Sequence, residues 1–256
     1  MNKIFAGLLT IVLLISCTEM TKPLVVGHRG AMGYAPENTI ASIERALDLG
    51  VDMIEIDVFK CSSGEIVVFH DEKLERLTNG EGYLEDKSFF MLRQLRVADE
   101  HQIPMLQDVL KAIDKKARLN IELKGDDTAE KVNHIVTYYV ENNGWQLSDF
   151  VISSFKWDEL RKLRELNPDI AIGVLTEEDP MGALEVAKEL NAYSIHPDHS
   201  TLTAENVEAI KGEGFKVFTW TVNEQAEIER MKAYGVDGII SDYPDRVAEE
   251  VLMPAM

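Results

Sequence analysis

Short apolar runs alternate with segments of helical periodicity along almost the whole chain, and this alternation restricts the fold more than any other feature. Eight runs rich in Val, Ile and Leu fit buried strands, and apolar residues recur every three to four positions in the segments between them. The predicted strands are Leu24–Gly27, Met53–Val58, Arg118–Leu123, Phe150–Ser154, Ile170–Leu175, Tyr193–His196, Lys216–Thr221 and Gly238–Ser241. The predicted helices are Ile40–Leu49, Val109–Ala117, Ala129–Val140, Trp157–Leu166, Ala183–Leu190, Ala204–Ile210, Ala226–Tyr234 and Pro244–Leu252.

Eight β/α units in 256 residues predict an α/β fold of the (β/α)8 TIM-type barrel class, for which roughly 250 residues are typical. A doubly wound parallel sheet is the alternative, but the first strand lacks the G-x-G-x-x-G turn of dinucleotide-binding folds. One stretch, Phe59 to Leu106, exceeds the length of a single connection. Gly64 there can turn a hairpin into Glu65–Phe69, which predicts a short insertion after the second strand.

The N-terminal segment predicts export rather than folded structure. A basic start is followed by an apolar run, Ile4 to Ile15, which is too short to span a bilayer. Its end, Leu14-Ile15-Ser16-Cys17, resembles the bacterial lipobox. We therefore expect a signal peptide over residues 1–16, a lipid on Cys17, a tether over residues 17–23 and one barrel domain over residues 24–256. An ordinary signal peptide with an incidental Cys is the alternative.

The predicted location is a bacterial membrane surface, periplasmic or external. Thr18 follows the lipidated position, where an Asp would favour retention at the inner membrane, so the outer membrane is preferred. Cys61 would then have no cysteine partner, and we interpret it as a structural residue at a strand end.

The charge balance limits the class of partner. Asp and Glu total 45 against 26 Lys and Arg, a formal net charge of -19. Nucleic-acid binding needs basic patches, which this sequence lacks. An anionic small molecule remains compatible with the composition, because a bound metal ion reverses the local sign of charge.

Three carboxylates fall near the ends of two predicted neighbouring strands. Glu55 and Asp57 are two positions apart, so they share one face of their strand, and Glu122 repeats the pattern on the next barrel strand. Buried acids this close need a shared proton, basic partners or a metal ion. Three carboxylates suit Mg²⁺ or Ca²⁺, although pairing with Lys or Arg is the alternative for an isolated pair.

The same edge of the barrel carries two histidines, two basic residues and a tryptophan. His28 and His70 each end a predicted strand, and imidazoles can accept and donate protons near neutral pH. Arg29 and Lys124 can contact a phosphate or neutralise the acids. Trp220 ends the seventh barrel strand and either covers the ligand or fills the core.

Taken in order along the chain, these motifs resemble the glycerophosphodiester phosphodiesterase family. The resemblance runs from about Leu24 to Arg246 and is carried by the segments His28-Arg29-Gly30, Ala35-Pro36-Glu37-Asn38-Thr39, Glu55-Ile56-Asp57, His70-Asp71, Leu74 to Gly82, Ile103-Pro104-Met105-Leu106, Glu122-Leu123-Lys124, Trp220-Thr221-Val222-Asn223 and Gly235 to Pro244. It implies a divalent cation held by Glu55, Asp57 and Glu122. It also implies acid–base histidines at His28 and His70 and substrate contacts at Arg29 and Lys124.

The expected activity is metal-dependent hydrolysis of glycerophosphodiesters to sn-glycerol 3-phosphate and an alcohol. A phospholipase D-like hydrolase of intact phospholipids is the enzymatic alternative, against which the loops show no cluster of aromatic residues. A lipoprotein that binds glycerophosphodiesters without cleaving them is the non-enzymatic alternative. The sequence leaves open the preferred alcohol, Ca²⁺ or Mg²⁺, the acid and base among the two histidines, a water or 2-hydroxyl nucleophile, and the oligomeric state.

Overall fold

The structure is a computed structural model and describes residues 22–248. The predicted signal peptide, Cys17 and the tether up to residue 21 lie outside the described residues, as do residues 249–256 of the predicted barrel domain.

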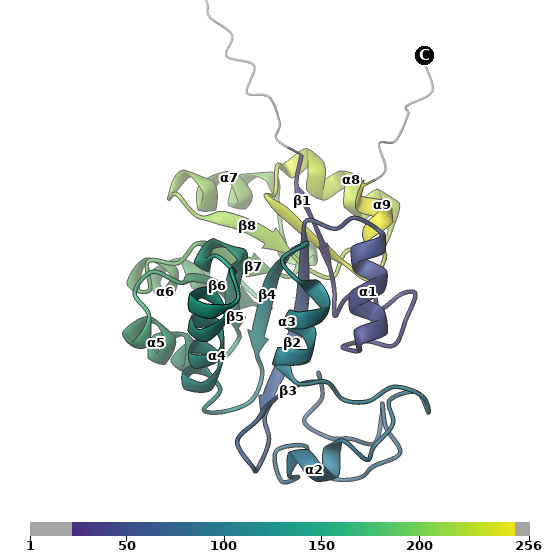
Figure 1. The fold of residues 1–256 in the computed structure, drawn as a ribbon. Coiled ribbons are helices and arrows are strands. Elements are labelled where there is room, and N and C mark those ends of the chain that lie inside the picture. The colour runs from purple at the N-terminus through teal and green to yellow at the C-terminus, as the bar shows by residue number, and fades with distance from the viewer. Residues whose placement is uncertain (1–21, 249–256) are drawn as a thin grey trace, which may run out of the picture.

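Eight parallel strands form a closed barrel, which confirms the predicted fold class. The sheet order is β1-β9-β8-β7-β6-β5-β4-β2-β3, and pairing of β1 with β2 closes it. Helices lie around the outside, as Figure 1 shows. The strands are β1 Leu24–Gly27, β2 Met53–Lys60, β3 Ile66–Val68, β4 Arg118–Leu123, β5 Phe150–Ser154, β6 Ala171–Thr176, β7 Ser194–Pro197, β8 Lys216–Thr219 and β9 Gly238–Ser241.

Eight of the nine described helices correspond to predicted segments, with boundary differences given below, whereas α2, a short helix in the insertion, was not predicted. The helices are α1 Ile40–Asp48, α2 Phe89–Leu92, α3 Leu106–Ile113, α4 Ala129–Asn142, α5 Trp157–Leu166, α6 Leu184–Glu189, α7 Ala204–Gly212, α8 Gln225–Tyr234 and α9 Pro244–Ala248, with 3-10 turns η1 Leu147–Asp149, η2 Pro180–Ala183 and η3 His199–Thr201.

Helix α3 differs most from its predicted range. It begins three residues before the predicted start at Val109 and ends at Ile113, because Asp114 and Lys115 adopt positive φ angles of 44° and 63°. The second difference concerns Ala183, which belongs to a 3-10 turn that precedes α6.

The core lies between the strands and the outer helices. Residues of β2 are buried along nearly its whole length, as expected for a parallel strand covered on both sides. The outward-facing residues, such as Ile54, Ile56 and Val58, belong to the same buried apolar cluster as residues of α1 and α3. Residues between them, such as Glu55 and Asp57, therefore point into the barrel, which explains how acids come to lie in a buried strand.

The insertion, residues 69–105, forms a small body beyond one end of the barrel. Strand β2 continues past the barrel and pairs antiparallel with β3, with Phe59 opposite Val67. Residues of this hairpin and of the insertion pack into a separate cluster: Phe59, Cys61, Val67, Phe69, Leu74, Leu84, Leu92, Val97 and Ile103. Buried Cys61 thus contributes to a local core, with its Sγ 3.3 Å from a Glu65 carboxylate oxygen.

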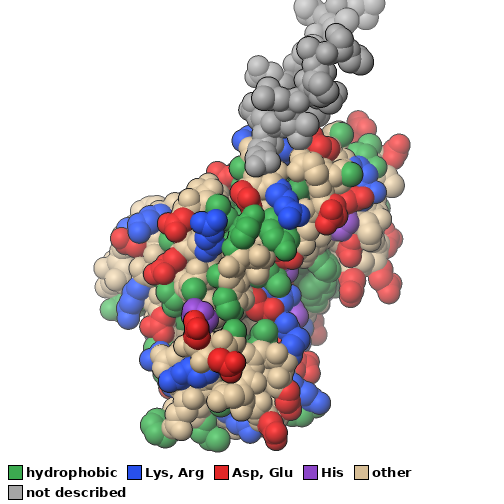
Figure 2. Space-filling view, turned by 90° about the vertical axis from the view of Figure 1, so that its right-hand side faces the viewer, with side chains coloured by type: hydrophobic (Ala, Val, Ile, Leu, Met, Phe, Trp, Pro, Cys, Tyr) green, Lys and Arg blue, Asp and Glu red, His purple; other side chains and the backbone are tan. Residues whose placement is uncertain are grey.

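The insertion and the two ends of the described chain lie at opposite ends of the molecule. In Figure 1, α2 is at the bottom, whereas the start of β1 and α9 are at the top. Acidic and basic side chains are interspersed on the face shown in Figure 2, in keeping with a solvated surface. Within residues 22–248, no helix combines the length and hydrophobicity that a membrane crossing needs.

Candidate active site

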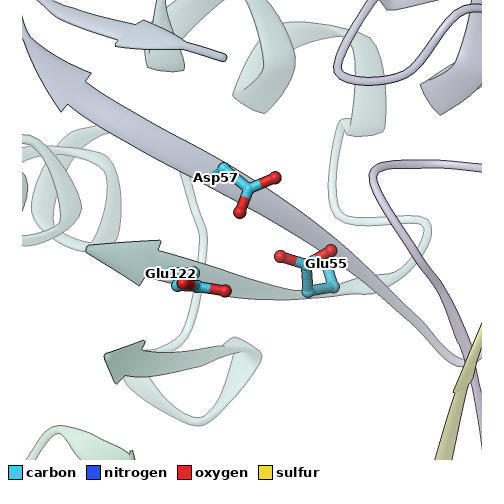
Figure 3. Close-up of side chains that lie close together, drawn as sticks. All are labelled: Glu55, Asp57 and Glu122. Atoms are coloured by element: carbon cyan, nitrogen blue, oxygen red, sulfur yellow. The ribbon is translucent and has the colours of Figure 1, made fainter. Parts of the chain in front are cut away.

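The three predicted acids converge inside the barrel. Parallel pairing of β2 with β4 sets Asp57 opposite Glu122, and Glu55 is on the same face two residues earlier. One oxygen from each of the three carboxylates lies within 4.8 Å of the others. Figure 3 shows Glu55 and Asp57 on one strand and Glu122 on its neighbour, with their carboxylates directed toward a common space.

Burial and mutual repulsion make this cluster hard to ionise without a cation. Burial, followed by the charges of Asp57 and Glu122, raises the pKa of Glu55 well above its usual value. Burial and the charge of Asp57 raise the pKa of Glu122 to about 7. Among the described residues, Glu55 Oε1 is a buried oxygen without a hydrogen-bond partner. The donor set and this free oxygen fit a hard divalent cation.

The loop after β1 supports the acids through an unusual backbone. Arg29 and Asn38 adopt positive φ angles of 49° and 57°, which non-glycine residues rarely occupy. The Arg29 amide donates to Glu55 Oε2 at 2.9 Å, and Asn38 Nδ2 donates to Asp57 Oδ2 at 2.8 Å. The strained backbone therefore directs donors at two of the three carboxylates.

The Arg29 side chain lies among acids. Its Nη1 donates to Glu37 at 2.6 Å, and its Nε is 3.3 Å from Asp57. Although burial opposes the charge, Asp57, Glu37 and Glu55 together raise the pKa of Arg29. The residue remains a fixed positive charge beside the acid cluster.

His28 is held by Asp242, which follows β9, and Asp242 is held by Asn223, which follows β8. His28 Nδ1 is 2.6 Å from Asp242 Oδ1, and Asn223 Nδ2 donates to the other oxygen of Asp242 at 2.7 Å. Burial opposes ionisation of Asp242, but the hydrogen bond and charge of His28 lower its pKa. An ionised Asp242 accepts the Nδ1 proton, which directs Nε2 toward Glu55, 3.9 Å away.

His70 is held by a different pair of residues. Its Nδ1 is 2.6 Å from Asp71 Oδ1, and Lys124 Nζ is 3.1 Å from its Nε2. Burial lowers the pKa of His70, and the charges of Arg29 and Lys124 act in the same direction. The Lys124 ammonium can only donate, so Nε2 accepts from it and the ring proton lies on Nδ1, beside Asp71. Lys124 also lies 3.3 Å from Glu122.

Seven of the eight site residues predicted for the barrel line one pocket, and the eighth, Asp57, is buried close to Glu55 and Glu122. The seven are His28, Arg29, Glu55, His70, Glu122, Lys124 and Trp220. Phe155 packs edge-on against Trp220, and both form an apolar wall facing the charged residues. The Trp220 indole donates to the His196 carbonyl at 2.9 Å, so the ring is anchored at the pocket wall.

Five residues that hold the reactive groups had no assigned role in the sequence. Asp71, Glu37 and Asn223 were named only within short motifs. Asp242 and Arg76 fell within the longer segments Gly235 to Pro244 and Leu74 to Gly82. Adjacency in the chain pointed to Asp71, since it directly follows His70. Asp242 lies 214 residues from the histidine that it contacts, so only the closure of the barrel between β1 and β9 brings the two together.

Comparison with known proteins decides the family. The model of the glycerophosphoryl diester phosphodiesterase family matches residues 28–246, a span that contains every predicted site residue of the barrel. The chain belongs to this family. It is 37% identical over 241 residues to a glycerophosphodiester phosphodiesterase of Caldanaerobacter subterraneus, a match covering 88% of this chain and 96% of that protein.

Other members agree in sequence and in fold. A glycerophosphodiester phosphodiesterase of Bacillus subtilis is 32% identical over 246 residues, covering 87% of this chain and 84% of that protein. A phosphodiesterase of Oleispira antarctica, solved in complex with the product sn-glycerol-3-phosphate, superposes with a TM-score of 0.81 at 30% identity and covers 88% of this chain and 95% of that one. The protein is a phosphoric diester hydrolase of the glycerophosphodiester phosphodiesterase type.

Proposed function

We propose that the protein hydrolyses glycerophosphodiesters to sn-glycerol 3-phosphate and an alcohol, with His28 and His70 moving the protons. One observation carries the proposal. Each imidazole has its Nδ1 held by a carboxylate, and both rings line the pocket that Glu55 and Glu122 line. One ring can then accept a proton from the nucleophile while the other donates one to the departing alkoxide.

Arg29 and Lys124 would bind the phosphoryl oxygens. Lys124 contacts His70, Glu122 and, at 4.0 Å, Asp57. A bound phosphoryl group offers stronger acceptors than an imidazole nitrogen, so it would draw Lys124 away from Nε2. That movement would leave the nitrogen of His70 free for proton transfer.

Glu55, Asp57 and Glu122 would hold one divalent cation, either Ca²⁺ or Mg²⁺. When bound, the ion supplies positive charge that neutralises the phosphoryl oxygens. The chain keeps the acids in place through the Arg29 amide and Asn38.

The direct test is a panel of glycerophosphodiesters given to metal-stripped protein, with Ca²⁺ or Mg²⁺ added back. We expect sn-glycerol 3-phosphate to be released only with the cation, and Glu55→Ala to lose this dependence together with the activity. Full activity in excess chelator, or binding without turnover by the metal-loaded protein, would contradict the proposal.

Cation binding should also be visible in stability. The pKa of Glu122 is about 7 in the folded protein and near 4.5 in the unfolded chain. The metal-free protein should therefore lose stability as the pH rises from 4.5 toward 7. A cation needs the ionised acids, so its stabilisation should grow over the same range. At a fixed cation concentration, 100 times the dissociation constant measured at pH 7.5, we expect a rise in Tm of roughly 5–10 °C at pH 7.5 and a smaller one at pH 5.5. A rise independent of pH would contradict the assigned site.

Hydrolysis of intact phospholipids is the second candidate, and one observation favours it. Contrary to the expectation that the loops expose no cluster of aromatic residues, three large apolar side chains are exposed on the insertion, with exposed fractions of 77% for Phe90, 51% for Met91 and 50% for Tyr83. The lower end of the molecule in Figure 2, formed by the insertion, carries hydrophobic side chains. Comparing glycerophosphocholine with phosphatidylcholine vesicles in one assay separates the candidates, and we expect the water-soluble diester to be the better substrate.

We also propose, from the sequence Leu14-Ile15-Ser16-Cys17, that the chain is exported and anchored by a lipid on Cys17. The outer membrane remains the preferred location. Radiolabelled palmitate should enter the wild-type chain but not Cys17→Ser, which should appear in the soluble fraction. Equal labelling of both would overturn the anchor.

A further inference from the structure

Glu37 and Asp71 share one arginine, although they belong to different loops of the protein. Arg76, in the insertion, donates from Nη1 and Nη2 to the two oxygens of Glu37, both at 2.9 Å. It also donates from Nε at 2.5 Å and from Nη2 at 2.7 Å to the two oxygens of Asp71. Two edges of one planar guanidinium thus fix two carboxylates relative to each other.

Each carboxylate in turn contacts a group that the proposed function uses. Glu37 Oε1 accepts from Arg29 Nη1 at 2.6 Å, and Asp71 Oδ1 lies 2.6 Å from His70 Nδ1. The contacts form one continuous chain from the phosphate-binding arginine to the histidine. Arg76 is its central member, and its side chain is 49% exposed whereas that of Glu37 is 6% exposed.

We propose that Arg76 is a positioning residue that sets the guanidinium of Arg29 and the imidazole of His70 in a fixed relation. The inference rests on the proposed function, since it takes both residues to act on one phosphodiester. Arg76 does not line the active-site pocket and acts through Glu37 and Asp71. It also joins the insertion to the barrel, so a segment outside the β/α repeat helps to align the catalytic groups.

The fork geometry makes the role specific to arginine. A lysine at position 76 keeps the charge and much of the aliphatic stem, but a single ammonium cannot bind four carboxylate oxygens in one plane. Loss of the fork leaves the pairs Glu37–Arg29 and Asp71–His70 in place but free to move against each other. Displacements of about 1 Å at reacting groups can lower a rate on the order of 100-fold.

The chain offers two matched controls. Arg161 also bridges two carboxylates, Asp158 at 2.8 Å and Glu189 at 2.7 Å and 2.9 Å, but on helices α5 and α6 away from the pocket. Arg96 belongs to the insertion and donates to the carbonyls of Arg93 and Leu95. The first control tests for loss of an exposed ion pair, and the second for loosening of the insertion.

The experiment compares wild type, Arg76→Lys, Arg76→Ala, Arg161→Ala and Arg96→Ala on glycerophosphocholine with saturating cation. We expect Arg76→Ala to lower kcat about 30- to 100-fold and to raise KM, because it displaces both a proton-transfer group and a binding group. Arg76→Lys should lose nearly as much while melting within about 3 °C of wild type. Both control variants should stay within a factor of two in kcat and in KM.

Guanidinium ion added at low millimolar concentration gives a readout that a merely structural role would not move. It should raise the kcat of Arg76→Ala at least tenfold and should not raise the kcat of wild type or of Arg161→Ala. If the wild type is active and Arg76→Lys has the same kcat and KM as the wild type, the inference is overturned but the proposed function stays intact. Losses in Arg96→Ala equal to those in Arg76→Ala would also overturn it. A wild type inactive on every glycerophosphodiester would refute the proposed function itself.

Discussion

The two histidines have similar partners but are supported by different parts of the molecule. His28 is fixed by Asp242 and Asn223, which follow barrel strands β9 and β8. His70 is fixed by Asp71, and Asp71 is fixed by Arg76 of the insertion. One imidazole therefore depends on the closure of the barrel, and the other depends on an added segment.

The two supports differ in the charge and the exposure of the group that holds the carboxylate. On the barrel side, Asn223 binds Asp242 with its amide and accepts from the Asp242 backbone at 2.9 Å, so neutral groups in a half-buried position do the holding. On the insertion side, the half-exposed and charged Arg76 holds Asp71. An exposed ion pair adds little to the free energy of unfolding, yet a bidentate one still defines geometry. We infer that alignment on the insertion side can change without loss of the fold.

Removing either imidazole should have the largest effect, and it tests whether both supports serve catalysis. His28→Ala and His70→Ala should each lower kcat by roughly two to four orders of magnitude on glycerophosphocholine, because each removes a proton-transfer group. Circular dichroism and Tm near those of wild type serve as controls. Rates near wild type in both variants would contradict the assignment.

Removing the supporting carboxylates should separate the two sides. Asp242→Asn should cost on the order of 100-fold in kcat, whereas Asp71→Asn should cost about 10-fold. The reason is that the His28–Asp242 pair is the more buried, with exposed side-chain fractions of 15% and 18% against 27% and 23% for His70 and Asp71, so water replaces the lost contact less readily there. Steady-state kinetics at saturating cation measure the ratio. A larger loss in Asp71→Asn would reverse the comparison.

The smallest effect on activity is expected at a histidine that neither side uses. His196 is fully buried, its Nε2 lies 2.7 Å from Ser194 Oγ, and burial lowers its pKa to about 3. His196→Gln should change kcat less than threefold at pH 7.5, provided that the variant folds.

His196 should also affect the free energy of unfolding at acidic pH. Its depressed pKa contributes stability above the unfolded value near 6.5, and this contribution is lost as the pH falls toward 3. By pH 4 wild type should have lost about 3 kcal/mol more than His196→Gln, at about 1.4 kcal/mol per pH unit. Urea unfolding at pH 7, 5.5 and 4 measures this, and parallel pH profiles would contradict it.

Most of the fold could be predicted because its signals are local. Strands such as Met53–Lys60 and helices such as Trp157–Leu166 carry their own periodicity, and acids two positions apart on a buried strand indicate an inward-facing site. Helix α3 was predicted too late in the chain. Its buried residues, Leu106, Val109, Leu110 and Ile113, have helical spacing, but the preceding Pro104 and Met105 obscured the start.

Apart from Asp71, which adjoins His70 in the chain, the supports of the site could not be predicted, since they depend on contacts between distant segments. Asp242 meets His28 across 214 positions, and Arg76 meets Glu37 across 39. Neither spacing follows from periodicity. The positive φ angles of Arg29 and Asn38, which direct donors at Glu55 and Asp57, are also imposed by packing rather than by residue type.

The claim that two differently supported imidazoles divide the proton transfers is tested most directly by changing the leaving group. A p-nitrophenyl ester of glycerol 3-phosphate releases an anion that needs no proton, so it bypasses the general acid but not the base. We predict that one of the two variants, His28→Ala or His70→Ala, regains most of its activity on this ester while the other remains impaired. Equal impairment of both variants on both substrates would contradict the account.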